Sequence, residues 1–571
     1  MKQHPIRHPL HSAAARDLNT LPGGLLLADH KQLSTCRPLA ASALPQRLII
    51  PMQQHIGQPC EALVQVGERV LKGQKIADAP GNLSAPVHAS SSGRVVEIAT
   101  YPIPHPSALT APCIVIASDG EEQWCRLEPL RDDPTTLERE PLVARIRAAG
   151  VVGMGGGGFP SSIKLTPGSE RNIHTLVING VECEPYITCD DLLMRSEAAR
   201  VVRGIGVMLH LLRAERCLIG IEDNKPEAAA AMQAAVAEQG LPHTEVVVIP
   251  TRYPSGGEKQ LIYILTGLEV PSGKIPADIG CVCHNVGTAA AVGDAIFEGR
   301  PQIERIVTLS GAGVVAPQNL RVRIGTLIAD LIPQVGGYTP LANRMILGGP
   351  MMGFTLAHDQ IPITKAANSI LVPSAAELPD PGPALPCIRC GRCAEVCPMW
   401  LLPQQMYWHI RAKNPEKSQA YNLLDCIECG CCAHVCPSHI PLVQYFRFAK
   451  ADLRERAAEA RRNERAQQRS MAREERLQRL EAEKQARLAA KKAAAQERIA
   501  ANQQVNQSDP KQAAIAAARQ RAAEKRARLA AQGVTPQNTE ALKDFQQRQI
   551  AAAERRRQAS SGSPPAPAEK P

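Results

Sequence analysis

The chain has 571 residues, a length that predicts several domains rather than one. Its formal net charge is +10, and aromatic residues make up only 3% of the sequence. This scarcity of stacking side chains argues against a nucleic-acid-binding protein, and no apolar run approaches the roughly 20 residues that span a bilayer. The positive charge is concentrated after Phe448, which favours an anionic lipid surface or an acidic partner.

Residues 1–35 predict a lead-in segment with a turn at Pro22–Gly24 and without the apolar stretch of a secretory signal. We therefore expect the chain to stay on the reducing, cytosolic side of the membrane. From 36 to 125, short apolar runs alternate with Gly and Pro, which predicts a small all-β module. Its two halves, Val66–Ala77 and Gly93–Ile98, resemble the barrel-sandwich hybrid of biotinyl and lipoyl carrier domains. The link Asp78–Asn82 has no acceptor lysine, so a structural or docking role is expected rather than that of a carrier arm.

Residues 130–298 predict an α/β domain with a parallel sheet. Strands are expected at 175–178, 217–221 and 245–249, and helices at 142–149, 192–212 and 226–239. The spacing of Gly153, Gly155 and Gly158 matches the dinucleotide fingerprint, although a helix rather than a strand precedes it. Consecutive glycines let backbone N–H groups approach a phosphate, and a flexible surface turn is the alternative interpretation.

Residues 300–372 predict a compact α+β module, with strands at 306–309, 320–323 and 345–347 around a helix that begins at Leu327. A Pro-rich linker, 373–386, follows. From 449 to 571 the sequence is rich in Ala, Arg, Lys, Glu and Gln, which predicts a solvated helical rod that is broken at Pro510 and ends in a disordered tail after Ser560. A specific partner-binding arm is the alternative.

Two cysteine runs between 387 and 448 carry the strongest chemical signal. Each reads C-x2-C-x2-C-x3-C-P, which is the ligand spacing of a bacterial ferredoxin with two [4Fe–4S] clusters. In that arrangement the fourth cysteine of each run serves the cluster of the other run, whereas a pair of zinc ribbons, the alternative, carries two ligands per knuckle. The first cluster is thus expected on Cys387, Cys390, Cys393 and Cys436, and the second on Cys426, Cys429, Cys432 and Cys397. Cys431 does not fit the spacing and is expected to be a buried bystander.

Four further stretches resemble the flavin-binding subunit of respiratory complex I: Gly153–Pro160 with Lys164, Asn179–Pro185, Ser255–Lys259 and Asn285–Thr288. The module after them looks like the soluble-ligand-binding β-grasp domain of the same superfamily. The order of all parts is similar to that of the RnfC family, which belongs to the Rnf ion-translocating electron transport complexes. The resemblance covers nearly the whole chain, and only the tail is unspecific. It implies a multidomain α/β and α+β protein with a barrel-sandwich module, a flavin domain, a β-grasp domain and a two-cluster ferredoxin domain.

The resemblance also implies roles for individual residues. Glu182 and Glu184 match the acidic pair beside the flavin and the nicotinamide, and are the candidate catalytic residues. Phe159 occupies the place of an aromatic ring that stacks on the nucleotide. The other candidate cofactor-binding residues match the phosphate side and the ring side of flavin mononucleotide (FMN): Gly153, Gly155, Gly156, Lys164, Asn179, Gly257, Glu258, Asn285 and Thr288.

Complex I has arginine, aspartate and glutamate where this chain has Met154, Val181 and Lys259. The resemblance therefore supports the prediction of NADH binding less strongly than that of FMN binding. The function implied is a peripheral subunit on the cytoplasmic side of the inner membrane. It takes electrons from NADH through FMN to two [4Fe–4S] clusters, and passes them to membrane subunits and to a ferredoxin or a redox regulator. A docking subunit without functional flavin, or the flavin subunit of a soluble hydrogenase or formate dehydrogenase, are the alternatives.

Overall fold

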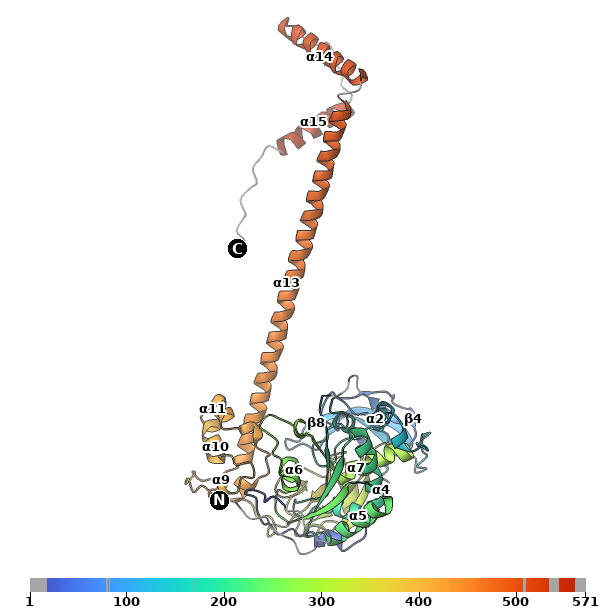
Figure 1. The fold of residues 1–571 in the computed structure, drawn as a ribbon, viewed down its shortest axis with the longest axis vertical. Coiled ribbons are helices and arrows are strands. Elements are labelled where there is room, and N and C mark those ends of the chain that lie inside the picture. Colours follow the sequence, from blue (N-terminus) through green and yellow to red (C-terminus); the bar gives the residue numbers. More distant parts are fainter. Residues whose placement is uncertain are drawn as a thin grey trace. The chain divides into compact units, whose positions relative to one another are not determined.

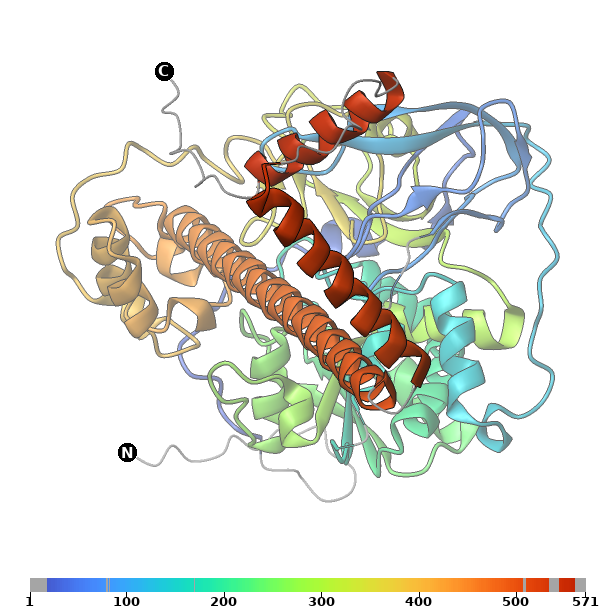
Figure 2. The ribbon, with the colours of Figure 1, turned by 90° about the horizontal axis from the view of Figure 1, so that it is seen from above.

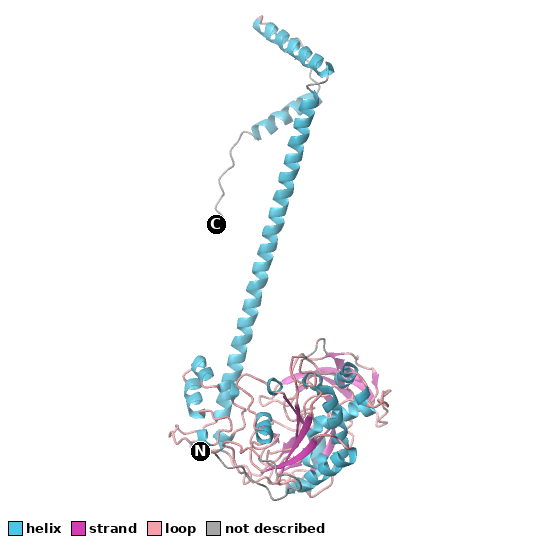
Figure 3. Cartoon of the chain, in the orientation of Figure 1, coloured by secondary structure: helices cyan, strands magenta, loops and turns pink. Residues whose placement is uncertain are grey.

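The computed structural model describes residues 18–78, 81, 83–168, 170–506, 510–533 and 544–559. It divides into two compact units, the first ending at Ala457 and the second beginning at Ala458. All strands of the described chain lie in the first unit, and the described part of the second is helical (Figure 3).

The first β module consists of two small antiparallel sheets that enclose one apolar core. Alternate residues of its strands, such as Leu48 and Ile50, point into that core and are fully buried. One sheet has the order β2-β8-β7-β4, and the other β3-β5-β6. The all-β prediction is confirmed; within the predicted link, residues 79, 80 and 82 lie outside the described chain. The strands are β2 Arg47–Pro51, β3 Glu61–Ala62, β4 Arg69–Val70, β5 Lys75–Asp78, β6 Val87–His88, β7 Gly93–Pro102 and β8 Thr110–Ser118.

The α/β domain is built on a four-stranded sheet in the order β11-β10-β9-β12, and all three strand pairings are parallel. The predicted strands and helices are present, and β12 is an additional strand that the sequence analysis did not predict. The strands are β9 Thr175–Asn179, β10 Arg216–Glu222, β11 Thr244–Ile249 and β12 Cys281–Asn285. The helices are α2 Arg139–Ala148, α3 Ser161–Lys164, α4 Cys189–Leu212, α5 Pro226–Gln239, α6 Glu258–Thr266 and α7 Val286–Gly293. Two short 3-10 helices, η1 Pro134–Thr136 and η2 Pro276–Ile279, and a π-helical segment, η3 Asp294–Glu298, accompany them.

The sheet is covered on both faces because successive side chains of a strand point in opposite directions. Leu176 and Ile178 of β9 join the core made by α4, α5 and α7, which Figure 1 shows grouped on one side of the strands. Val177, between them, joins a second core with α6 and with Leu18 and Leu21 of the lead-in. A sheet with helices on both faces follows, which is the doubly wound arrangement.

The β-grasp module has a six-stranded mixed sheet in the order β1-β14-β13-β17-β15-β16. Its edge strand β1, Ala40–Ala41, pairs in parallel with β14. The bounds predicted for the first β module, 36–125, include these two residues, and no local pattern reveals their pairing with a strand of another module. The other elements are β13 Glu304–Ser310, β14 Gln318–Arg323, β15 Ile346–Leu347, β16 Phe354–Thr355, β17 Ser369–Leu371, α8 Ile328–Leu331 and η4 Ile332–Val335, and the lead-in contributes α1 Gln32–Thr35.

The cysteine-rich segment folds into short helices around a small core of its own, in which Phe446 is fully buried. These helices, drawn in tan, gather in one lobe in both views (Figures 1 and 2). They are α9 Arg392–Glu395, α10 Pro403–Arg411, α11 Pro415–Ala420, η5 Leu423–Asp425, α12 Cys431–His434 and the first turns of α13 Leu442–Asn506.

The second unit contains the rest of α13, α14 Pro510–Ala531 and α15 Asp544–Ala559. The helical prediction is confirmed, and α14 begins at Pro510, where proline is tolerated because the first helical N–H needs no partner. α13 begins at Leu442, earlier than the predicted start at 449, since its first turns pack into the cysteine-rich core. The tail predicted after Ser560 lies outside the described residues. Among the described helices, none combines the length and apolar character needed to cross a membrane.

Candidate flavin and iron–sulfur sites

Two asparagines mark the point where the strand order of the parallel sheet reverses. β10 and β11 extend from one side of β9, and β12 lies on the other side. Asn179 and Asn285 are the last residues of β9 and β12 and are paired in register. Ligands of open α/β sheets bind in the crevice at such a switch point, beyond the carboxyl ends of the strands. Tertiary structure thus brings together two residues that are 106 positions apart.

The glycine loop lies over this crevice. An ideal Cβ on Gly155 would be 3.6 Å from the Asn285 Cβ, and the Met154 N–H donates to Thr288 Oγ1 at 2.9 Å, which ties the loop to α7. Gly155, Gly156 and Gly157 are exposed, and nothing lies within 4 Å of an ideal Cβ on Gly156 or Gly157. Open space above consecutive backbone amides is the cradle that a phosphate or a planar ring requires, so the loop fits FMN.

The remaining predicted flavin ligands lie near the same carboxyl ends of the strands. The Asn179 side chain donates from Nδ2 to the Gly256 carbonyl at 2.8 Å and so holds the turn before α6. Glu258, in the first turn of α6, pairs with Lys164 Nζ at 2.5 Å. Both partners are only partly buried, so Lys164 retains access to a phosphate. Phe159 is half-buried beside the loop, and its carbonyl accepts a hydrogen bond from the Gly153 N–H.

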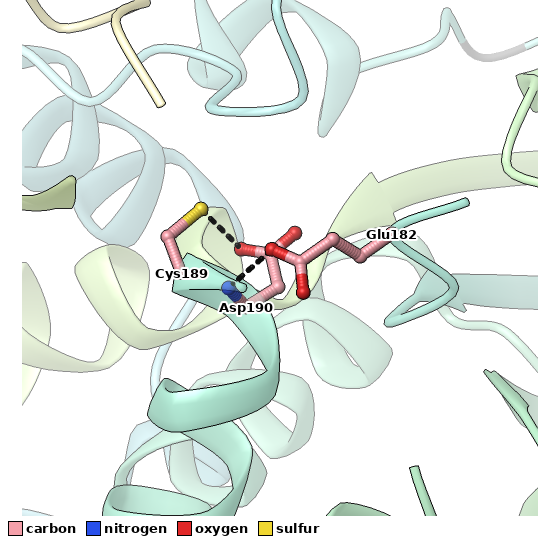
Figure 4. Close-up of side chains that lie close together, drawn as sticks. All are labelled: Glu182, Cys189 and Asp190. Atoms are coloured by element: carbon pink, nitrogen blue, oxygen red, sulfur yellow. Dashed lines mark hydrogen bonds between the residues drawn. The ribbon is translucent and has the colours of Figure 1, made fainter. Parts of the chain in front are cut away.

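Glu182 faces the amino end of α4. Its carboxylate accepts from the N–H groups of Asp190 at 2.7 Å and Asp191 at 3.1 Å, and it adopts a left-handed backbone conformation with φ 48°. Figure 4 shows Glu182 and Asp190 converging with Cys189. Burial, reinforced by the charge of Glu182, raises the pKa of Asp190 to about 7. Asp190 also accepts from Asn285 Nδ2 at 2.5 Å, so it belongs to the crevice although the sequence analysis did not select it.

Glu184 points elsewhere. Its carboxylate accepts from the N–H groups of Met351 at 2.7 Å and Met352 at 2.9 Å, in the β-grasp module. Burial raises the pKa of Glu184. The structure therefore separates the predicted acidic pair: the Glu182 carboxylate lies at the crevice, and the Glu184 carboxylate is anchored to a neighbouring domain.

A buried lysine of the lead-in holds the loop that carries both glutamates. Lys31 Nζ donates to the carbonyls of Glu182 at 2.7 Å, Glu184 at 3.2 Å and Ile187 at 2.7 Å. Burial lowers the pKa of Lys31, and the charge of Lys225 lowers it further. Lys31 was not among the predicted site residues, because no local pattern links it to a loop 151 residues away.

The first cysteine cavity has a volume of about 410 Å³ including its mouth. Four thiols line it: Cys387, Cys390, Cys393 and Cys436. All four are free of disulfides, and Cys390 is exposed. Three cysteines of one run and the last of the other thus share one cavity, which is the donor set that a [4Fe–4S] cluster requires.

The second cysteine cavity has a volume of about 340 Å³ including its mouth, and two of its cysteines, Cys429 and Cys432, are buried. Its lining includes Cys397, Cys426, Cys429, Cys432 and also Cys431, which is fully buried. Burial raises the pKa of the Cys426 thiol to about 11. Binding to iron stabilises the thiolate and so offsets the free energy needed to deprotonate this buried thiol. The geometry fits a second cubane, and Cys431 adjoins it as a ninth thiol.

The second cavity lies directly against the flavin domain. Tyr253 Oη donates to the Cys429 carbonyl at 2.6 Å, and Gln260 Nε2 lies 2.8 Å from Met399 Sδ. Tyr253 was not among the predicted site residues, although it stands just before the motif that begins at Ser255. The first cavity has no contact of this kind with the flavin domain among the described residues.

The structure shows what surrounds each of the three residues that differ from their counterparts in complex I. Met154 lies beside Gly287 of α7, and the Met154 Sδ atom is 3.3 Å from the position that a Cβ on Gly287 would occupy. Val181 is fully buried in the core under α6, where an aspartate would lack solvation. Lys259 turns toward the cysteine-rich segment, with Nζ 4.0 Å from Asp425 Oδ1. In this chain, position 259 therefore serves the contact between two domains.

Asn285→Ala is expected to weaken FMN binding about tenfold and to destabilise the domain by about 1 kcal/mol, because the side chain caps α7 through the Gly287 N–H at 2.9 Å. Asn414→Ala is the matched control, since Asn414 caps α11 through the Lys417 N–H at 3.0 Å in the cysteine-rich segment. The control should lose similar stability and keep its FMN affinity. Fluorescence titration of deflavinated protein with FMN and thermal melts measure both; equal FMN affinity in the two variants would contradict the assignment.

Models of four domain families match the chain. They are the Nuo51 FMN-binding domain over residues 146–294, the RnfC barrel sandwich hybrid domain over 19–121, the SLBB domain over 306–355 and the 4Fe-4S dicluster domain over 386–440. The first match contains the glycine loop and both crevice asparagines, and the last contains both cysteine cavities' thiols. The chain thus carries an FMN-binding domain and a 4Fe-4S dicluster domain.

Two solved structures of NAD+-reducing [NiFe]-hydrogenase, in the H2-reduced and the air-oxidized state, are also similar. They have TM-scores of 0.41 and 0.40 at 17% identity, and cover 56% and 55% of this chain and 63% and 64% of those chains.

Curated relatives share about half of the aligned residues. The C component of the ion-translocating oxidoreductase complex of Pseudomonas aeruginosa is 51% identical over 454 residues, which cover 79% of this chain and 58% of that protein. The corresponding C components of Vibrio cholerae and Yersinia enterocolitica are each 47% identical, over 78% of this chain and 57% and 64% of those proteins. The chain thus spans less than two thirds of the length of these relatives. The matches over four domains and these identities show that the chain belongs to the RnfC family, the C components of ion-translocating oxidoreductase complexes.

Proposed function

We propose that this chain is the peripheral subunit of an inner-membrane, ion-translocating oxidoreductase complex, and that it oxidises NADH on the cytoplasmic side. It passes electrons to the membrane subunits and to a ferredoxin or a redox regulator. FMN, when bound, supplies the conversion between a two-electron donor and one-electron carriers. The names of the relatives support the setting, and the two matched cofactor domains support the chemistry.

The observation that carries the proposal is the contact between the flavin domain and the second cysteine cavity. The Tyr253 hydroxyl reaches the Cys429 carbonyl from the turn that also presents Gly257 and Glu258 to the crevice. An electron carrier in the cavity lined by Cys426, Cys429, Cys432 and Cys397 therefore lies next to the flavin domain. The cavity of Cys387, Cys390, Cys393 and Cys436 opens outward, at the exposed Cys390.

Different residues of the crevice contact different parts of FMN in this proposal. Gly153, Gly155, Gly156, Asn285 and Thr288 form the glycine loop and its support, and Lys164 offers a charge for the phosphate. Asn179, Gly257 and Glu258 border the ring side, and Phe159 offers a stacking surface. Glu182 is oriented by the amino end of α4 at the crevice, whereas the Glu184 carboxylate is held at the contact with the β-grasp module.

The test is anaerobic reconstitution of the full chain with FMN, iron and sulfide, followed by titration with NADH. The flavin absorbance should bleach, and the electron paramagnetic resonance signal of reduced clusters should then grow. Dithionite serves as the control, because it donates single electrons and reduces the clusters without any hydride transfer to FMN. Bound flavin that dithionite bleaches and NADH does not would contradict NADH oxidation, and iron without any flavin would favour a docking subunit.

A further inference from the structure

The helix α13 carries most of its positive charge along one line. Figure 1 shows α13 as one continuous helix, and every residue from 461 to 498 is exposed. Steps of three or four residues from Arg462 to Arg498 pass through eleven positions that share one face of the helix. Nine of these positions are basic, and we call them the basic stripe, which runs for about 54 Å. They are Arg462, Arg465, Arg469, Arg473, Arg476, Lys484, Arg487, Lys491 and Arg498.

The rest of the helix surface has the opposite net charge. Residues 458–506 include twelve Lys and Arg residues, seven Glu residues and no Asp. The basic stripe takes nine of the cations, so three cations and all seven Glu residues lie off it. Among the described residues, Lys484 is the only member of the stripe with an ion pair, in which its Nζ is 3.8 Å from Glu481 Oε2 on an exposed surface. The charges of the stripe are therefore available to a ligand.

This segregation of charge opposes the stability of a helix in water. Like charges three or four residues apart repel each other, whereas Glu and Lys at the same spacing attract and stabilise a solvated helix. The stripe places cations at this spacing in successive turns from Arg462 to Arg476. A solvated rod would gain stability from mixed charges, and an anionic surface along the stripe would relieve the repulsion.

Apolar side chains border the basic stripe. Leu477, Leu488 and Ile499 each follow a cation of the stripe directly, and their spacing of 11 residues places them on one side of the helix. Their exposed fractions are 53%, 50% and 58%. This spacing is too sparse for the seam of a coiled coil with an acidic partner helix, and the phosphate backbone of a nucleic acid would leave these side chains uncovered. A lipid interface suits both features, because headgroup phosphates attract the cations and acyl chains cover the apolar side chains.

We propose that the basic stripe binds the surface of a membrane that is rich in anionic phospholipids, with α13 lying along the headgroups. Each Lys or Arg held near such a surface strengthens binding about fivefold, so nine in one line form a strong contact. The inference goes beyond the proposed function, because this direct contact with lipid depends neither on NADH oxidation nor on a membrane subunit.

The experiment measures co-sedimentation of the FMN- and cluster-loaded full chain with two kinds of vesicle. One kind is pure phosphatidylcholine, and the other contains equal parts of phosphatidylcholine and phosphatidylglycerol. The chain should bind the anionic vesicles alone, and should be released as the salt concentration rises. The triple variant Arg469→Gln, Arg473→Gln and Lys491→Gln removes three charges from the stripe, and we expect it to bind the anionic vesicles at least about tenfold more weakly.

The matched control is the triple variant Arg461→Gln, Arg479→Gln and Lys492→Gln, which removes the same residue types and the same charge off the stripe. Gln resembles Arg and Lys in helix propensity, so circular dichroism should show equal helix content in both variants. We expect the control to lose less than about threefold in vesicle affinity.

Equal vesicle binding by the two triple variants, or equal binding of the unaltered chain to neutral and anionic vesicles, would refute the assignment of the stripe. Tighter binding to duplex DNA or to polyglutamate than to anionic vesicles, at equal concentrations of negative charge, would replace lipid with a nucleic acid or an acidic protein. NADH should bleach the flavin of both variants as it does in the unaltered chain. Failure of the unaltered chain to oxidise NADH would refute the proposed function and leave the vesicle result unchanged.

Discussion

Cys436→Ser is expected to eliminate the cluster of the first cysteine run while leaving the cluster of its own run in place. The reason is geometric, since Cys436 lines the cavity of Cys387, Cys390 and Cys393. A serine hydroxyl is a poor substitute for a thiolate, so the cluster in that cavity should be lost during anaerobic purification. Iron should fall to about half of that in the unaltered chain, because each cluster holds about four irons. Electron paramagnetic resonance of the dithionite-reduced variant should show one isolated cluster instead of two interacting ones.

Cys431→Ser is the matched control for this substitution. Cys431 is fully buried beside the second cavity and stands one position from Cys432, so serine there disturbs the packing without removing an assigned ligand. Its iron content should remain that of the unaltered chain. Cys397→Ser is the reciprocal variant and should lose the second cluster. Loss of the second cluster from Cys436→Ser would mean that each run binds its own cluster, and iron loss from Cys431→Ser would make the ninth thiol a ligand.

Lys31→Met is expected to release FMN and to lower the free energy of unfolding of the flavin domain by roughly 2–4 kcal/mol. The substitution leaves three carbonyl groups, of Glu182, Glu184 and Ile187, without their common donor in a buried site. The loop would then lose the conformation that aims Glu182 at the crevice. Flavin content after gel filtration, the flavin midpoint potential and thermal melts measure the effect.

Lys72→Met controls for the loss of a buried lysine as such. Lys72 is 6% exposed in the first β module and pairs with Glu122 at 2.8 Å, away from the loop that carries Glu182. This variant should lose stability and retain FMN with an unchanged potential. If Lys31→Met and Lys72→Met retained flavin equally, Lys31 would be a structural lysine and not a positioning residue of the flavin site.

Much of the fold was accessible from the sequence because its signals are local. The strand that begins at Thr175 and the helix from Pro226 to Gln239 follow from an apolar run and from alanine content, and they are present with nearly the predicted bounds. The strand that ends at Asn285 was missed, since its run of Cys, Val, Cys and His is short and partly polar. The pairing of Ala40–Ala41 with β14 was not predicted, because the partner strand is 280 residues away in the sequence.

The sequence by itself determined the kinds of chemistry available, because cysteine spacing and glycine runs restrict which cofactors a short segment is able to hold. Only the tertiary structure decided which groups meet. It placed Asn179 beside Asn285, brought Lys31 to the loop of Glu182 and turned Glu184 toward the β-grasp module. These contacts depend on strand order and on the burial of side chains between domains. Both arise from the whole set of long-range contacts, and no local pattern in the sequence encodes them.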